Sequence, residues 1–137
     1  MDEPLNLVLF SGTDDKLQAA AVLTAGAAAL GRPVNVFLQY WALDAFTSAK
    51  IRRDHGLAPE AGPDGRAAVV ALARAGQSPW AETLRQAKDL GGVDIQACSL
   101  SMDLLDLEER DLDPLVDGVE GITAFYLNAG NGQIVFV

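Results

Sequence analysis

The chain is poor in the residues that form disulfides and metal centres. Its 137 residues include one cysteine and one histidine, Cys98 and His55. A lone cysteine excludes a disulfide within the chain, and two residues cannot supply the three or four ligands of a zinc site. The sequence also lacks the His-Glu-x-x-His, Gly-x-Ser-x-Gly and Gly-x-Gly-x-x-Gly motifs. We therefore expect no metal ion and no cofactor.

Positive charge is scarce as well. The chain has 10 Lys and Arg residues against 19 Asp and Glu residues, a formal net charge of -9. Nucleic acids and anionic membranes require clustered basic residues, so we expect neither as a partner. The segment 1–5, Met-Asp-Glu-Pro-Leu, lacks the basic start and long apolar run of a signal peptide. These features indicate a cytoplasmic protein.

Apolar residues make up 50% of the chain, enough for one domain over residues 1–137 with a sizeable core. Apolar runs bounded by turn residues predict strands at 5–10, 34–38, 93–98, 115–117 and 133–137. Helical patterns predict helices at 14–30, 67–75, 78–90 and 122–129, one that carries Phe46 and Ile51 inward, and one that begins after Cys98. This order predicts an α/β fold, a three-layer α/β/α sandwich around a mainly parallel five-stranded sheet of the flavodoxin or Rossmann kind.

Two segments raise questions that the pattern leaves open. The helix at 14–30 is apolar nearly all round, so another element or another subunit must cover its second side. We take this as an indication of a homo-oligomer. The stretch 55–66 holds two prolines and three glycines and shows no periodicity. It predicts a flexible surface excursion within residues 47–77, which is either a lid or an insertion.

The candidate functional residue is Cys98, at the point where a buried strand is followed by a helix. Backbone N–H groups at a helix N-terminus favour the thiolate form, and such a position is expected to expose the sulfur. The alternative has about equal weight from position alone, because a free cysteine is usually a small buried hydrophobic residue. His55 could act as the base of a cysteine-hydrolase dyad, but its place in the excursion favours a surface histidine.

Other loops at the carboxyl ends of the strands are expected to form a pocket with Cys98. Ligands of open α/β sheets bind at this edge, and the first loop would border the cysteine if the third strand lay next to the first. Lys16 is the only basic residue in these loops. It either keeps the sulfur anionic or points to solvent, as an exposed lysine on a first helical turn usually does. The predicted pocket residues are Ser11, Gly12, Thr13, Asp14, Lys16, Tyr40, Trp41, Ser99, Ser101 and Met102.

The sequence Ala97-Cys98-Ser99-Leu100-Ser101-Met102-Asp103 after a short strand resembles the Cys-x-x-Ser-Met-Asp signature of the DsrE/DsrF-like sulfur-carrier family, most closely its DsrE2 branch. The segments 11–16, 37–43 and 121–125 are similar to that branch too. The excursion at 47–77 departs from the Met- and Lys-rich insertion common there.

The resemblance implies a DsrE-like sulfur carrier that holds sulfur as a persulfide on Cys98 and relays it between donor and acceptor proteins. It implies a sulfurtransferase-like relay rather than a classical turnover enzyme. It also implies assembly as a homo- or hetero-oligomer, commonly a trimer or hexamer, and we expect a homo-oligomer here. The other hypothesis is a non-catalytic α/β module for oligomerisation or small-ligand binding, in which Cys98 is buried and inert.

Overall fold

The computed structural model describes residues 3–137. The strands are β1 (Leu5–Leu9), β2 (Val34–Leu38), β3 (Val93–Cys98), β4 (Gly118–Glu120) and β5 (Ile134–Phe136). The α-helices are α1 (Asp14–Ala29), α2 (Tyr40–Ala45), α3 (Gly62–Arg74), α4 (Trp80–Leu90), α5 (Ser99–Leu104) and α6 (Ile122–Ala129). Short 3-10 turns lie at Pro59–Ala61 and Glu109–Asp111.

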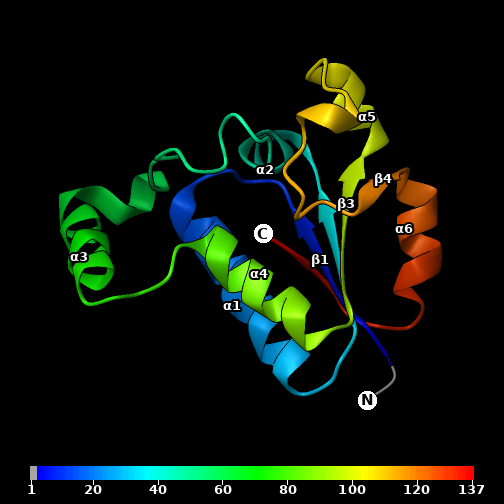
Figure 1. Ribbon diagram of the computed structural model, residues 1–137, viewed down its shortest axis with the longest axis horizontal. Coiled ribbons are helices and arrows are strands. Elements are labelled where there is room, and N and C mark those ends of the chain that lie inside the picture. The colour runs from blue at the N-terminus through cyan, green and yellow to red at the C-terminus, as the bar shows by residue number, and fades with distance from the viewer. Residues whose placement is uncertain (1–2) are drawn as a thin grey trace.

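All five strands form one parallel sheet in the order β4-β3-β2-β1-β5. Helices α1 and α4 cover one face of this sheet and α6 covers the other (Figure 1). The predicted α/β/α sandwich with a five-stranded parallel sheet is therefore confirmed. The third strand does not lie next to the first, the arrangement in which the first loop would border Cys98, because β2 lies between β1 and β3 and separates them.

The main apolar core lies between the sheet and the α1/α4 pair. Every second residue of β1 and β2 points into it, including Leu7, Leu9 and Val36, which are almost completely buried. Helix α4 packs beside α1 and covers part of the side of α1 that the sheet leaves open. The apolar pattern of α1 predicted that another element or subunit covers its second side, and α4 of the same chain provides part of this cover. Val22 and Leu23 of α1 remain 56% and 45% exposed.

The opposite face of the sheet is smaller and more polar. Its apolar part is a second cluster formed by Val8, Phe37, Cys98 and Phe125, with Phe125 contributed by α6. The rest of this face carries amides and carboxylates. Asn35 donates to the side-chain oxygen of Asn6 and to the main chain of α6 at Asn128, at 3.0 and 3.2 Å. A few hydrogen bonds and one small cluster therefore hold α6 in place.

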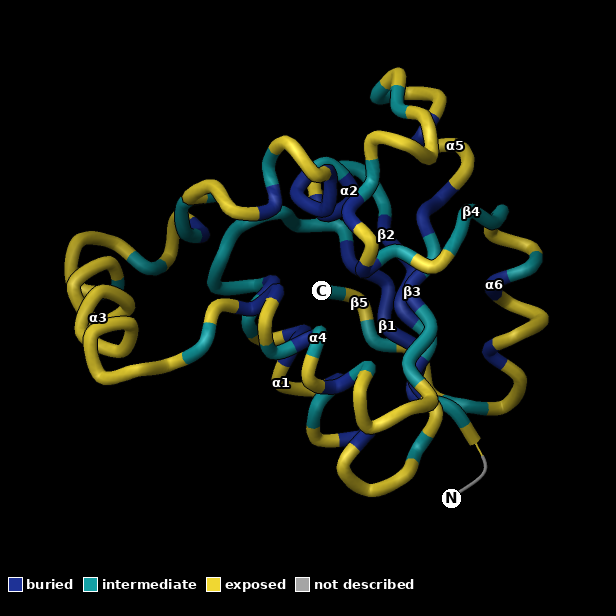
Figure 2. The backbone as a smooth tube through the Cα atoms, in the orientation of Figure 1, coloured by how far each residue is buried: buried dark blue, intermediate teal, exposed yellow. Residues whose placement is uncertain are grey.

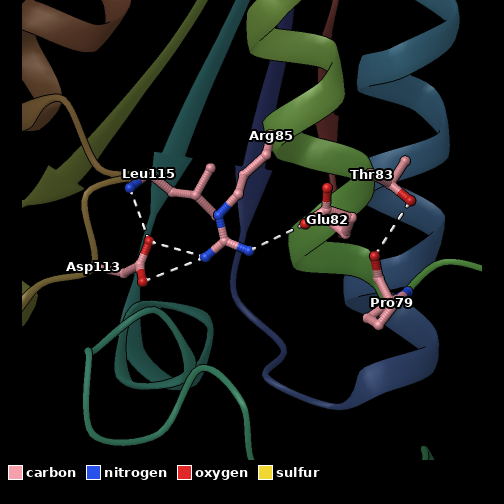
Figure 3. A network of polar contacts seen from close by, with 6 residues as sticks. All are labelled: Pro79, Glu82, Thr83, Arg85, Asp113 and Leu115. Atoms are coloured by element: carbon pink, nitrogen blue, oxygen red, sulfur yellow. Dashed lines mark hydrogen bonds and ion pairs between the residues drawn. The ribbon is translucent and has the colours of Figure 1, made fainter.

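The fourth strand is not where the sequence pattern predicted it. Residues 115–117 form no strand, because Leu115 is buried in the main core within a turn that the Asp113 carboxylate holds. That carboxylate accepts the Leu115 N–H at 2.9 Å and the Arg85 guanidinium of α4 at 3.4 Å (Figure 3). This network fixes the connection after α5 against α4. It delivers the chain into β4 at Gly118–Glu120, three residues later than expected.

Two helices also differ from their predicted bounds. Helix α2 begins at Tyr40 and ends at Ala45, and turns follow it to residue 53, with Phe46 and Ile51 buried as predicted. Helix α3 begins at Gly62, within the stretch predicted to lack periodicity, and none of its residues is buried. It projects from the body of the molecule, and nearly all of its residues are exposed (Figure 2).

Candidate active site at the end of strand β3

Cys98 is the last residue of β3 and directly precedes the first turn of α5, as the sequence predicted. Its backbone has the extended conformation of an N-cap residue, with φ -69° and ψ 120°. The expected exposure of the sulfur is wrong for the single chain, because Cys98 is only 4% exposed. The strand alternation explains this burial, since it turns the side chain towards the face that α6 covers.

The immediate surroundings of Cys98 are apolar. Val8 and Phe37 of the neighbouring strands and Phe125 of α6 complete its cluster. The rings of Phe37 and Phe125 are stacked with centroids 4.9 Å apart. Among the described residues no hydrogen bond to the sulfur is found. The thiol is therefore covered by two strand side chains and by one ring from α6.

The loops after β1 and β2 pack closely against each other. A Cβ atom at Gly12 would lie 2.4 Å from the carbonyl oxygen of Trp41, so only glycine permits this approach. The first residue of α2, Tyr40, has a φ of 45°, which is rare for a residue with a side chain. The Ser101 hydroxyl of α5 accepts its N–H at 3.1 Å. Two residues of the predicted pocket, one from α2 and one from the Cys98 motif, are thus joined directly.

The remaining predicted residues lie in α5, in α2 and in the loop and first helical turn after β1. Met102 and Ser101 are buried beneath α5, whereas Ser99 and Trp41 are exposed. The first loop does not border the cysteine, because the exit of β2 lies between the ends of β1 and β3. Its members Ser11, Gly12, Thr13, Asp14 and Lys16 are half-buried.

The two aspartates that begin α1 hold the start of the excursion. Asp14 accepts the backbone N–H of His55 at 2.9 Å and the indole N–H of Trp80 at 3.0 Å. Asp15 accepts the N–H of Ala58 at 3.1 Å with both oxygens. Burial raises the pKa of Asp15, but hydrogen bonds from Ala58 and from the Lys16 N–H outweigh it and hold that pKa below its ordinary 3.8. Residues 54–58 are therefore anchored rather than free.

His55 lies on the far side of the sheet from Cys98. Its ring packs 6.0 Å, centroid to centroid, from that of Trp80, which belongs to the helix pair on the main-core face. Cys98 points to the α6 face. The structure therefore does not bring the two side chains together as a dyad. The His55 ring is half-buried rather than a surface group, and within the described residues its Nε2 atom is buried without a hydrogen-bond partner.

One neighbour of Cys98 in the sheet is a residue that the sequence did not suggest. Glu120 of β4 is paired in register with Cys98, and both side chains point to the α6 face. Its carboxylate accepts the side-chain N–H of Asn128 at 3.3 Å. Burial raises the pKa of Glu120 above its ordinary 4.5, and the charge of Asp94 adds to this shift. The sequence did not suggest Glu120, because the fourth strand was predicted at residues 115–117 and Glu120 then lay in a loop.

The chain between residues 3 and 137 has no helix long and apolar enough to span a membrane. In the same residues no group of three or more His, Cys, Asp or Glu side chains could hold a metal ion.

Comparison with known proteins supports the family suggested by the cysteine motif. The sequence model of the DsrE/DsrF/DrsH-like family matches residues 1–61, a segment that ends before Cys98. The uncharacterized protein YrkE of Bacillus subtilis (strain 168) is 28% identical over 149 aligned positions, which take in 93% of this chain and 92% of YrkE.

Two solved structures share the fold at low sequence identity. The YchN protein of E. coli superposes with a TM-score of 0.59 at 13% identity, covering 100% of both chains. MTH1491 of Methanobacterium thermoautotrophicum, a protein of unknown function, superposes with a TM-score of 0.53 at 15% identity and covers 99% of this chain and 100% of its own. The predicted resemblance to the DsrE/DsrF-like family is thus confirmed by the match over residues 1–61, although that match does not distinguish the DsrE2 branch.

Proposed function

We propose that this protein carries sulfur as a persulfide on Cys98 and relays it from a donor protein to an acceptor protein. The observation that carries the proposal is the position of the only cysteine, at the carboxyl end of a parallel strand directly before a helix. Ligands of open α/β sheets bind at this edge. The family match and the fold support a role in sulfur relay in sulfur metabolism or thiolation.

The transfer is an exchange at sulfur that needs no net oxidation. The Cys98 thiolate attacks the terminal sulfur of a donor persulfide, a new S–S bond forms, and the donor S–S bond breaks. The donor cysteine leaves as a thiolate and takes up a proton. An acceptor thiolate then attacks the terminal sulfur held on Cys98, and the Cys98 thiol is restored. The protein therefore acts as a carrier between two partners.

Access to the sulfur requires α6 to move away from the sheet. Phe125 and Ala129 are the buried residues of this helix, while Tyr126 and Leu127 are 60% and 78% exposed. A helix held by two buried side chains and a few hydrogen bonds belongs to the low-stability end of a fold, where local opening is expected. Contact with a donor protein at the exposed side of α6 would favour the open state.

Cys98 also supports a second candidate function. It is buried in a cluster of apolar side chains, as an inert structural cysteine would be. In that case the protein is a non-catalytic α/β module for oligomerisation or ligand binding. The accessibility of the thiol to reagents separates the two functions.

We also propose that the protein is a homo-oligomer, with a trimer or hexamer as the expected form. Apolar side chains remain exposed on α1, α6 and the edge strand β5, where Phe136 is 66% exposed. Exposed apolar surface of this extent favours association. Light scattering at micromolar concentration tests this, and a monomer there would contradict it.

The decisive experiment is intact-mass spectrometry after incubation with a persulfide donor. We expect a species heavier by about 32 Da, the mass of one sulfur atom, on the native protein. Cys98→Ser is nearly isosteric and should keep the fold yet gain no mass. If the native protein gains no sulfur, and its thiol reacts with iodoacetamide no faster than a buried cysteine, the inert-cysteine function is correct instead.

A further inference from the structure

Glu120 and Cys98 occupy facing positions on adjacent strands. The register of β3 and β4 pairs them directly, and adjacent strands lie about 4.8 Å apart. The preceding pairs show which face they share, since Ala97 and Val119 both point to the main core. Cys98 and Glu120 must then both point to the α6 face. A carboxylate is thus anchored beside the candidate sulfur carrier.

The other titratable groups considered for Cys98 lie elsewhere. His55 packs against Trp80 on the opposite face of the sheet. Lys16 belongs to the first turn of α1, whose loop is separated from β3 by β2. On the α6 face, β3 carries one further acidic residue, Asp94, at the far end of the strand from Cys98. Of these groups, Glu120 is therefore the one that the strand register places beside the thiol.

We propose that Glu120 accepts the proton of Cys98 during sulfur transfer. This inference rests on the proposed sulfur-carrier function of Cys98. In the first step the carboxylate takes the thiol proton while the sulfur attacks the terminal sulfur of a donor persulfide. The donor S–S bond breaks, the departing donor thiolate takes a proton from Glu120 or from water, and no electrons are gained or lost overall.

The environment of Glu120 suits this task. Burial and the negative charge of Asp94 raise the pKa of Glu120, which brings it closer to the pKa of the thiol from which it would accept the proton. From α6, Asn128 contributes an uncharged amide, and its 3.3 Å hydrogen bond is long enough to be exchanged. Asp117 precedes β4 but pairs with Lys88 of α4, on the other side of the sheet. The position of Glu120 beside Cys98 and its raised pKa therefore both favour Glu120 as the proton acceptor.

The test compares Glu120→Gln with the natural chain in the rate of sulfur uptake from a small persulfide donor, glutathione persulfide. Loss of a general base typically costs 10²- to 10⁴-fold, so we expect a rate about 100-fold lower near neutral pH. The natural chain should show a rise in rate as Glu120 loses its proton, above pH 4.5. The variant should lack this rise. Glu120→Asp should restore part of the rate.

Asp89→Asn is the matched control, because it removes one negative charge from an exposed position of α4, on the face of the sheet opposite to Cys98. It should change the rate no more than about threefold, given the distance between the two positions. A Glu120→Gln rate equal to or above that of the natural chain would overturn the inference and leave the carrier function intact. If the natural chain takes up no sulfur at all, the carrier function itself fails. Burial disfavours the charge of Glu120, so Glu120→Gln should not lower the free energy of unfolding. Urea unfolding can therefore verify that this variant is folded.

Discussion

Shortening Phe125 to alanine should expose Cys98. Phe125 is 1% exposed, stacks on Phe37 and is one of two buried residues of α6. Truncation of a buried phenylalanine costs about 3–5 kcal/mol of stability. The lower end applies here, because one side of α6 faces solvent and the helix can shift to fill part of the cavity. Since the apolar contact of α6 with the sheet depends on this ring, most of the cost should fall on the opening of α6. At 1.4 kcal/mol per factor of ten, we expect about 100-fold faster alkylation of Cys98.

Iodoacetamide labelling in native buffer, followed by intact mass, measures this rate. Leu127→Ala is the control on the same helix, since Leu127 is 78% exposed and its loss should change the rate less than about twofold. Both variants must first show a native unfolding transition in urea. Equal rates for Phe125→Ala and the natural chain would refute the reasoning. Cys98 would then be reached without any opening of α6, through the loops at the end of β3.

Three further predictions concern the framework of the site. Asp15→Asn should destabilise the protein at neutral pH and progressively less in acid, because a depressed pKa gives stability that is fully present above the ordinary 3.8 and is lost as pH falls through the folded value. Urea titrations across this range measure it, and a pH-independent difference would contradict it. Asp113→Ala leaves the buried N–H of Leu115 unpaired and should cost about 1–3 kcal/mol in free energy of unfolding. Gly12→Ala should lower the free energy of unfolding by roughly 1–3 kcal/mol through overpacking. Gly26→Ala is the control and should not lower it, because a Cβ atom there would have no neighbouring atom within 4 Å. Equal melting temperatures for the two variants would exclude the clash at Gly12.

The sequence predicted the individual strands and helices better than it predicted which of them lie side by side. Apolar runs such as Val34–Leu38 define buried parallel strands without reference to the rest of the chain. The order of those strands depends on tertiary packing, and no local pattern states that β2 lies between β1 and β3. For this reason the loop containing Lys16 was predicted beside Cys98, although β2 separates them.

The fourth strand failed for a local reason. Leu115 and Val116 resemble the start of a strand, but Leu115 is buried by a turn built around the Asp113 carboxylate. The real strand, Gly118–Glu120, is three residues long and has one apolar side chain, so it carries little periodic signal. Because Glu120 depends on that strand, the neighbour of Cys98 could be found only in three dimensions. The burial of Cys98 has the same origin, since α6 covers it from a distant part of the sequence.

The arrangement of β1 beside β5 has a consequence for how the protein folds. The Asn6 side chain donates a hydrogen bond to the carbonyl of Gln133, 127 residues further along the chain. Contacts between such distant residues are slow to form, because a very long loop must close before they stabilise anything. During synthesis one edge of β1 therefore stays unpaired until β5 has emerged. An apolar strand with an open edge is a site of aggregation, so this step is the one at which a nascent chain would benefit most from a chaperone.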